Sequence, residues 1–215
     1  MKEIIFGTSN PAKLAQIQGV LESLGIKVRS IAEFGDVPDV EENGKTALEN
    51  AKIKALAYAK AIGQIVFSMD NALYIEGLPD DKQPGVHTRR IPGVEGKVTD
   101  DQMREYYAAL VESHGGEMAN YWEFGIVVAD SDGIIAETVA RTPNRILTSK
   151  VCPESIPGYP LESLQKDPES GKYLAEMSED ERAEFWRSTI GAKVEELFKS
   201  LELREGEVGD RPKLV

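Results

Sequence analysis

The residues best suited to chemistry begin with the run Thr8-Ser9-Asn10-Pro11-Ala12-Lys13, which follows the apolar stretch Ile4–Gly7. Asn10 can cap a helix that starts at Pro11, because proline at the first helical position loses no hydrogen bond. A helix N-terminus offers free N–H groups and positive charge to phosphate. Thr8, Ser9, Asn10 and Lys13 all lie within one turn of that end. The segment indicates either a phosphate site or an ordinary cap with one surface lysine; it lacks the Walker glycines.

Two carboxylates form the second group of candidates. Glu42 lies in the acidic stretch Val40–Thr46, and Asp70 lies between two expected strands, Ile65–Phe67 and Leu73–Ile75. We expect Asp70 at a strand end, where α/β enzymes often place ligand-binding groups. Together the two side chains would supply hard oxygen ligands for Mg²⁺. The alternatives are a solvated loop acid and a turn aspartate that caps its own backbone.

Helix start signals recur along the chain. The apolar spacing over Lys13–Leu24 predicts the first helix, and Gly25 is expected to end it. Capping boxes at Thr46, Thr99 and Ser178 predict three more. These helices are expected to end near residues 63, 112 and 201.

Strand signals alternate with these helices. Ile26–Ile31 is an expected strand, and Met118–Ala129 and Ile134–Ala140 flank Asp130-Ser131-Asp132-Gly133, a turn sequence typical of a hairpin. Residues 152–172 are rich in Pro, Gly and Ser and are expected to form a long ordered loop. The pattern predicts an α/β fold with a mixed twisted sheet and a long central hairpin, flanked by helices.

Composition excludes several classes of protein. The net charge is −12, from 37 acidic and 25 basic residues, which disfavours binding to duplex nucleic acid or to anionic membranes. Cys152 is the only cysteine, so no intrachain disulfide forms. No apolar run reaches the roughly 20 residues that span a bilayer, and the N-terminus is expected to be a strand rather than a signal peptide. We expect a cytoplasmic protein with one domain over residues 1–202 and a polar tail over 203–215.

Taken in order, these segments resemble the inosine/xanthosine triphosphate pyrophosphatase (ITPase) family over about residues 2–200. The family motif Thr/Ser-x-Asn-x-x-Lys matches Thr8–Lys13, and Glu-Glu-x-Gly-x-Thr-x-x-Glu-Asn-Ala-x-x-Lys-Ala matches Glu41–Ala55 at every fixed position. Asp-Asp-Ser-Gly-Leu corresponds to Met69–Leu73, and Pro-Gly-Val-x-Ser-x-Arg to Pro84–Arg90. Leu174–Met177 precede the last helix as the family requires.

The resemblance implies a two-lobed ITPase-like fold with the active site in the cleft, and a homodimer. It implies Mg²⁺-dependent hydrolysis of nucleoside triphosphates between the α and β phosphorus, giving a monophosphate and pyrophosphate. Lys13 and Lys54 would hold phosphate oxygens, and Glu42 and Asp70 would position Mg²⁺. Asp70 would also be the base that orients or deprotonates the attacking water.

The departures from the family fall mainly in the part that reads the base. Met69 replaces the first aspartate of the acidic pair, which would remove a carboxylate from beside the metal, and Asn71 replaces a serine near the phosphates. The base-binding Phe-Gly-Tyr-Asp and Ser-His-Arg segments correspond to the sequences around Tyr159 and Trp186-Arg187. Asn71, Tyr159, Trp186 and Arg187 join Thr8, Ser9 and Asn10 as predicted substrate-binding residues.

These departures leave the base preference open, with purine and deaminated triphosphates (ITP, XTP, dITP) as the first candidates. One alternative is a catalytically impaired nucleotide-binding protein on the same fold. Another is a Mg²⁺-dependent phosphatase that acts on a different phosphate ester. Release of pyrophosphate, binding alone, or release of terminal phosphate would distinguish the three.

Overall fold

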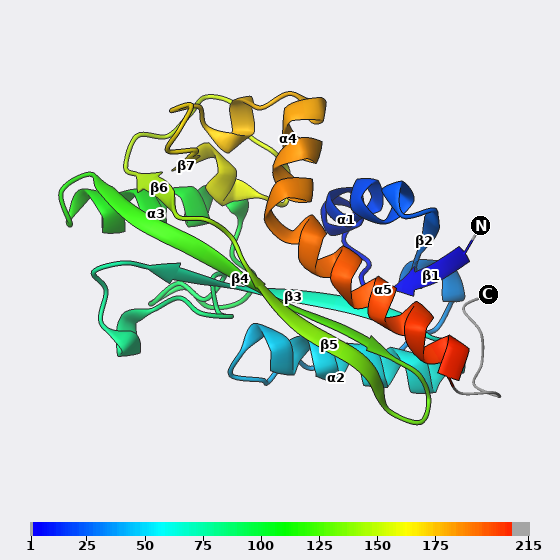
Figure 1. Ribbon diagram of the computed structural model, residues 1–215. Helices are drawn as coiled ribbons and strands as arrows, with labels where there is room; N and C mark the ends of the chain where they lie inside the picture. The colour runs from blue at the N-terminus through cyan, green and yellow to red at the C-terminus, as the bar shows by residue number, and fades with distance from the viewer. Residues whose placement is uncertain (1, 208–215) are drawn as a thin grey trace. The chain divides into compact units, whose positions relative to one another are not determined.

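A computed structural model of the chain describes residues 2–207 (Figure 1). The α-helices are α1 (Pro11–Ser23), α2 (Ala47–Ile62), α3 (Asp100–Glu112), α4 (Glu179–Trp186) and α5 (Ala192–Glu207). The strands are β1 (Lys2–Phe6), β2 (Ile26–Ser30), β3 (Val66–Ile75), β4 (Glu117–Ala129), β5 (Ile134–Arg141), β6 (Arg145–Thr148) and β7 (Gln165–Lys166). Short 3-10 turns, η1 to η4, lie at Ile31–Phe34, Asp80–Lys82, Pro160–Ser163 and Leu174–Glu176.

The first helix begins where its cap predicts. The side chain of Asn10 accepts a hydrogen bond from the Ala12 N–H, and Pro11 occupies the first turn. The predicted cap of α2 is confirmed in part: Thr46 accepts from the Glu49 N–H, but the Glu49 carboxylate accepts from the Lys45 N–H instead of closing the box on Thr46. The acid therefore ties the preceding loop to the helix.

The later capping boxes are both present, although the last helix differs from its prediction. Thr99 and Gln102 close the box that starts α3, and Ser178 and Glu181 close the one that starts α4. The expected single helix to residue 201 is wrong, because a π-helical segment, η5 (Arg187–Gly191), separates α4 from α5. Such a segment inserts a residue into the helical ladder, a local change that an apolar stripe does not reveal.

The strands form one mixed sheet in the order β2-β1-β3-β4-β6-β7, with β5 also paired to β4. β1 is parallel to β2 and β3, whereas β4 is antiparallel to β5 and β6. The predicted hairpin is confirmed as β4 and β5 (Figure 1). Asp130 accepts from the N–H groups of Asp132 and Gly133 and so fixes its turn. The predicted α/β class is confirmed.

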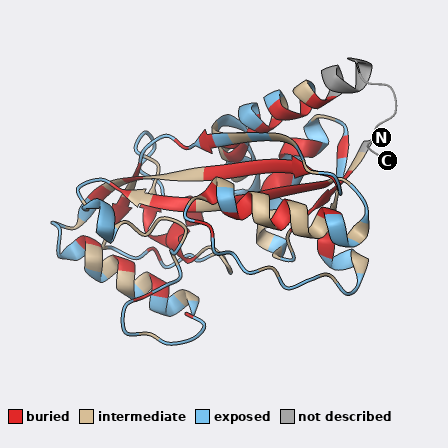
Figure 2. Ribbon diagram, turned by 90° about the horizontal axis from the view of Figure 1, so that it is seen from below, coloured by how far each residue is buried: buried red, intermediate tan, exposed pale blue. Residues whose placement is uncertain are grey.

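The expected break in the strand around Asp70 is wrong. β3 runs without interruption from Val66 to Ile75, and most of its residues are buried (Figure 2). Asp70 therefore lies in the middle of a strand. A polar side chain is tolerated there because charged and amide groups from two helices meet it, as described below.

Two compact units divide the chain. Among the described residues, the first comprises 2–71, 123–141 and 183–207, and the second comprises 72–122 and 142–182. α2 packs its alanines on one side of the first unit's sheet, where Ile5, Val66 and Val127 are buried. The second unit has its own core around α3, with Tyr107, Leu147 and Leu164 buried. One domain over residues 1–202 stays a prediction.

The end of the chain differs in part from its prediction. α5 continues to Glu207, so the first five residues of the expected tail are helical. The remainder, 208–215, lies outside the described residues. Between residues 2 and 207, no helix has both the length and the apolar character that crossing a bilayer requires.

Candidate active site

The loop between β1 and α1 holds the first set of predicted substrate-binding residues. Thr8 Oγ1 accepts a hydrogen bond from the Asn10 N–H at 3.2 Å, and the Thr8 carbonyl accepts from the Ser30 hydroxyl at 2.8 Å. Asn10 uses its side-chain oxygen as the helix cap, 2.9 Å from the Ala12 nitrogen. Ser9 is exposed. The loop is thus fixed at both sides, and the capping alternative holds for Asn10.

Helix α2 carries two polar residues on a face that is otherwise alanine. Its buried positions are Ala47, Asn50, Ala51, Lys54, Ala55 and Ala59, which share one side of the helix. Small alanines let the helix lie close to the sheet, and the longer Asn50 and Lys54 side chains reach β3. This face delivers an amide and an ammonium to the buried Asp70.

Asp70 is the centre of the site. Its Oδ1 atom lies 3.4 Å from Lys13 Nζ and 3.3 Å from Lys54 Nζ, and its Oδ2 atom accepts from Asn50 Nδ2 at 3.0 Å. Lys54 Nζ also lies 3.3 Å from Glu42 Oε2. The Asp70 and Lys54 side chains are only 7% and 9% exposed. Three side chains from the two helices α1 and α2 therefore converge on one carboxylate.

The cluster places two ammonium groups beside two carboxylates. Burial, and then the neighbouring charge of Lys54, lower the pKa of the Lys13 ammonium, while Asp70 and Glu42 oppose that shift. An anionic group placed beside Lys13 would favour the charged form of this lysine. Lys13 is 20% exposed and Glu42 is 42% exposed, so the cluster is open on the side of these two residues.

The two predicted metal ligands meet at the same lysine. Glu42 and Asp70 each place a carboxylate oxygen 3.3 Å from Lys54 Nζ. Two carboxylates beside the predicted phosphate-binding lysines form a set of hard oxygen donors, which suits Mg²⁺. The residues present therefore fit this ion.

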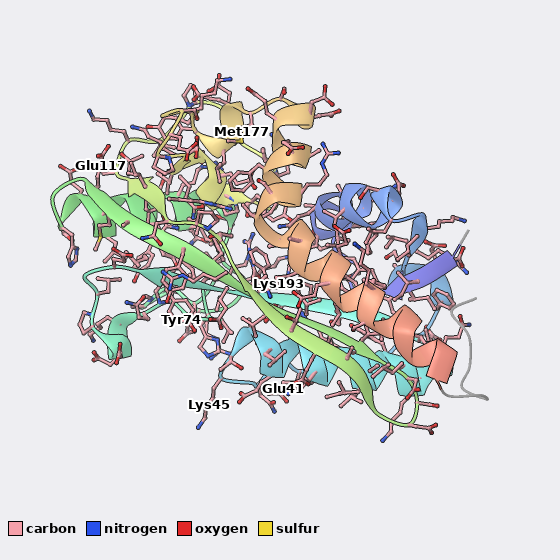
Figure 3. The ribbon with its side chains drawn as sticks, viewed as in Figure 1. Glu41, Lys45, Tyr74, Glu117, Met177 and Lys193 are labelled. Carbon is pink, nitrogen blue, oxygen red and sulfur yellow. The ribbon has the colours of Figure 1, made fainter. Side chains whose placement is uncertain are left out.

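The loop before α2 has an exposed rim and a buried end. Glu41 and Lys45 point into solvent (Figure 3). Gly44 is buried between them and donates its N–H to Asn50 Oδ1 at 2.8 Å. Gly44 therefore anchors the loop beside the cluster.

Met69 does not lie beside the proposed metal ligands, contrary to the sequence-based expectation. Successive side chains of a strand point to opposite faces, and Asp70 faces α2. Phe67, two residues before Met69, packs against Phe6 and Phe198 on the other face. Met69 is 2% exposed and belongs to that apolar face. By the same alternation the half-buried Asn71 points away from Asp70.

The residues that correspond to the family's base-binding segments lie on other elements. Trp186, at the end of α4, is buried edge-on against Phe124 and Phe185 in the first unit. Arg187 is exposed and pairs with Glu184 at 2.9 Å. Tyr159 belongs to the second unit, and burial raises the pKa of its hydroxyl. Substrate binding by these three residues stays a prediction.

Asn50 and Gly44 are site residues to which no role was assigned from the sequence. Both fall inside the motif that spans residues 41–55, but only the fold brings them to Asp70. A signal was present, because Asn50 and Lys54 repeat at helical spacing within the alanine face. Two polar residues on a buried helix face require partners.

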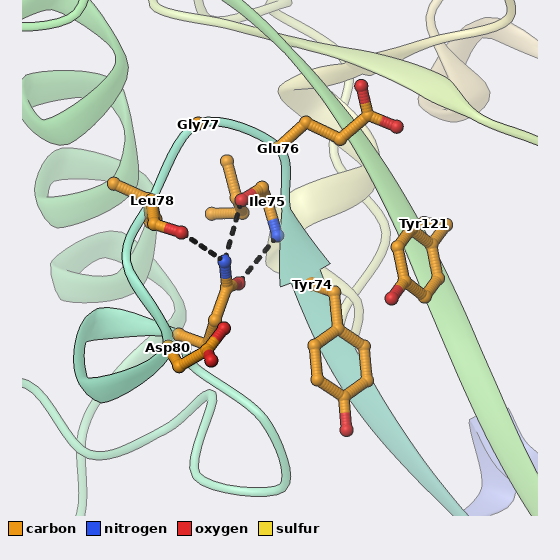
Figure 4. Close-up of a pocket in the computed structure, with 8 residues that line it drawn as sticks. Tyr74, Ile75, Glu76, Gly77, Leu78, Asp80 and Tyr121 are labelled. Atoms are coloured by element: carbon orange, nitrogen blue, oxygen red, sulfur yellow. Dashed lines mark hydrogen bonds between the residues drawn. The ribbon is translucent and has the colours of Figure 1, made fainter.

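The second unit contains a separate pocket of about 500 Å³, beside the stacked rings of Tyr74 and Tyr121 (Figure 4). Gln83 lies in its wall, and its amide is bonded to backbone groups of Ile75 and Leu78. The charged groups that line the pocket are the acids Glu76 and Asp80. This lining repels phosphate, so the pocket is unsuited to a triphosphate.

The fold and the cluster around Asp70 together define a class of protein. It is an α/β protein in which two lysines and an asparagine amide surround a carboxylate in the middle of a strand. Residues 4–188 match the model of the Ham1 family. The chain belongs to the Ham1 family.

Its relatives agree with this assignment. A dITP/XTP pyrophosphatase of Geobacillus kaustophilus is 26% identical over 217 residues, which cover 94% of this chain and 96% of the relative. One from Exiguobacterium sp. is 31% identical over 183 residues, covering 84% and 88%. The resemblance to inosine/xanthosine triphosphate pyrophosphatases is confirmed. The predicted enzyme class of the family, a hydrolase acting on acid anhydrides, is also confirmed.

Solved structures share the fold. A HAM1 protein from Coxiella burnetii has a TM-score of 0.72 at 24% identity, covering 93% of this chain and 100% of that one. A nucleoside-triphosphatase/dITP/XTP pyrophosphatase from Mycobacterium abscessus has a TM-score of 0.60 at 21% identity, covering 89% and 97%.

Proposed function

We propose that this protein hydrolyses purine nucleoside triphosphates, deaminated ones among them, between the α and β phosphorus, in the presence of Mg²⁺. The observation that carries the proposal is the convergence of Lys13 and Lys54 on Asp70, at 3.4 and 3.3 Å. The naming of relatives as dITP/XTP pyrophosphatases supports the substrate class.

The two lysines suit the binding of the polyphosphate. Phosphoryl transfer depends mainly on positioning and on neutralising the charge that develops on phosphate oxygens. Lys13 lies in the first turn of α1, and Lys54 is held on the buried face of α2. Because they come from separate helices, they can contact different oxygens of one chain of phosphates.

Asp70 suits the activation of water. It is a buried carboxylate flanked by ammonium groups, and it can accept a proton from, or orient, a water aimed at phosphorus. Glu42 and Asp70 would hold Mg²⁺, which when bound polarises phosphoryl oxygens. The rival reading, a nucleotide-binding protein without catalysis, rested on Met69 and on the altered base-binding segments. Strand alternation places Met69 on the face of β3 opposite to Asp70, which removes the first of these two supports.

The test is pyrophosphate release from a panel of standard and deaminated nucleoside triphosphates with Mg²⁺, for the wild type and for Asp70→Asn. The proposal expects pyrophosphate from at least one purine triphosphate and its loss in the variant. Release of terminal phosphate would indicate the alternative of a phosphatase that acts on a different phosphate ester, and binding without release would overturn catalysis. The order of rates across the panel gives the base preference.

A further inference from the structure

Asn50 connects the loop that carries Glu42 with the strand that carries Asp70. The side chain belongs to a residue that is 2% exposed, and both ends of its amide are engaged. Oδ1 accepts from the Gly44 N–H at 2.8 Å, and Nδ2 donates to Asp70 Oδ2 at 3.0 Å. One rigid planar group therefore joins segments that lie six residues before it and 20 residues after it.

Gly44 packs too closely against α2 to carry a side chain. A Cβ atom at Gly44 would lie 2.7 Å from Asn50 Oδ1 and 2.7 Å from Glu49 Cβ, so a larger residue does not fit. Glu42 is two residues before Gly44, and its carboxylate is half-exposed. Anchoring Gly44 against α2 therefore limits the positions that the Glu42 carboxylate can reach.

The Asp70 end fixes an orientation. The two lysines contact Oδ1, and an ammonium on a flexible stem imposes little direction on a carboxylate. Rotation about the bond to the carboxyl group is soft. The contact from Asn50 to Oδ2 leaves Oδ1 directed at the lysines, and because Asn50 sits on the helix that also carries Lys54, the three groups move together.

We propose that Asn50 is a positioning residue of this site, which sets the placement of the Glu42 and Asp70 carboxylates relative to each other. The part of this inference that is tested by kcat and KM rests on the proposed pyrophosphatase function. Loss of a partner that orients a metal-binding carboxylate typically lowers activity or metal affinity by about 10–100-fold. That range is the expected fall in kcat, with KM less affected because the lysines that bind phosphate remain.

Two substitutions separate the two hydrogen bonds. Asn50→Asp keeps an acceptor for the Gly44 N–H but replaces the donor to Asp70 with a second carboxylate. Asn50→Leu has a similar shape and removes both contacts. Lys52→Met is the matched control, because Lys52 lies on the same helix and pairs with Glu137 at 2.9 Å, so that its loss leaves both Asp70 and the Gly44 loop untouched.

The experiment measures kcat and KM for pyrophosphate release, hydrogen exchange at the Gly44 amide, melting temperature, and Mg²⁺ affinity by calorimetry with Mg²⁺ alone. We expect both Asn50 variants to lose about 10–100-fold in kcat. Gly44 exchange should speed up by about tenfold in Asn50→Leu, the factor that loss of one hydrogen bond gives, and should stay slow in Asn50→Asp. Lys52→Met should keep wild-type kcat.

Wild-type kcat in Asn50→Asp would overturn the proposal that Asn50 orients the Asp70 carboxylate. Unchanged hydrogen exchange at Gly44 in Asn50→Leu would overturn the proposal that Asn50 anchors the loop. A wild type that releases no pyrophosphate would refute the proposed function instead. In that case the Mg²⁺ affinity still decides the inference, because a folded Asn50→Leu that binds Mg²⁺ as tightly as the wild type overturns it. A fall in affinity would support it.

Discussion

At the scale of single residues, Lys54 is a buried charge that contacts two carboxylates. It is buried and lies 3.3 Å from both Glu42 and Asp70. Lys54→Met keeps the length of the side chain but removes the charge, leaving two carboxylates without their shared cation. We expect kcat/KM for pyrophosphate release to fall by about 10²-fold or more, as when one preorganised electrostatic contact is removed.

The matched control for Lys54→Met is Lys52→Met. Lys52 lies on the same helix, is partly exposed and pairs with Glu137 at 2.9 Å, away from Asp70. It should keep wild-type kinetics and lose little stability, since exposed ion pairs contribute about 0–1 kcal/mol. Equal losses in the two variants would contradict the role given to Lys54.

Cys152 is a second prediction at this scale. Burial, and then its hydrogen bond to Glu154, raise the pKa of the thiol to about 11. At pH 8 the native thiol should therefore react with a disulfide reagent about 100-fold more slowly than the unfolded thiol, whose pKa is near 9. A stopped-flow comparison of native and denatured protein measures this ratio. Equal rates would contradict the burial of the thiol.

The same shift has a consequence for stability. A group whose pKa is raised by folding stabilises the native state fully below its unfolded pKa. The contribution of Cys152 is therefore complete below pH 9 and is lost as the pH rises to about 11. Cys152→Ser should show a smaller loss of unfolding free energy over that pH window than the wild type.

At the scale of elements, a glycine on β4 determines how closely α2 approaches the sheet. A Cβ at Gly125 would lie 2.3 Å from the backbone nitrogen and Cα of Leu48. Backbone atoms cannot move aside as a side chain can, so Gly125→Ala should lower the free energy of unfolding by about 1–3 kcal/mol or more. It should also lower activity, because it displaces the helix that carries Asn50 and Lys54.

Gly19 provides a comparison in which the same substitution should raise the free energy of unfolding. It lies exposed within α1, and a Cβ there meets nothing within 4 Å. Gly19→Ala should raise the free energy of unfolding by about 0.5–1 kcal/mol, the gain from alanine in a helix interior. Urea denaturation of both variants measures the two changes. A destabilised Gly19→Ala would contradict the space assigned to it.

At the scale of the whole molecule, β3 and β4 each contribute residues to both compact units. Loss of either unit removes part of a strand from the other, so we expect one cooperative unfolding transition. The chain has two tryptophans, Trp186 in the first unit and Trp122 in the second. Trp122→Phe and Trp186→Phe leave one fluorescent reporter in each unit.

The single-tryptophan variants test this cooperativity. Within each variant, the fluorescence midpoint in urea should match the midpoint measured by far-UV circular dichroism. A tryptophan transition that precedes the loss of secondary structure would mean that its unit unfolds independently. Comparing probes within one variant removes the effect of the substitution on stability.

The sequence by itself determined the features that depend on neighbouring residues. Asn10, Thr99 and Ser178 start helices because a cap bonds to N–H groups within three residues. The turn at Asp130 forms its hairpin for the same local reason, and the motifs around Lys13 and Lys54 indicated the family. The partners in each of these interactions lie within a few residues of one another, so the local residue pattern was sufficient to predict them.

Only the tertiary structure decided how Asp70 is surrounded. Its partners Lys54 and Lys13 lie 16 and 57 residues away in sequence, and their contacts make a continuous strand possible where polar residues suggested a turn. The same packing turned Met69 to the opposite face and gave Asn50 its two bonds. Burying a polar group costs free energy unless hydrogen-bonding or charged partners offset the lost hydration. Here those partners are distant in sequence, so the local residue pattern does not reveal them.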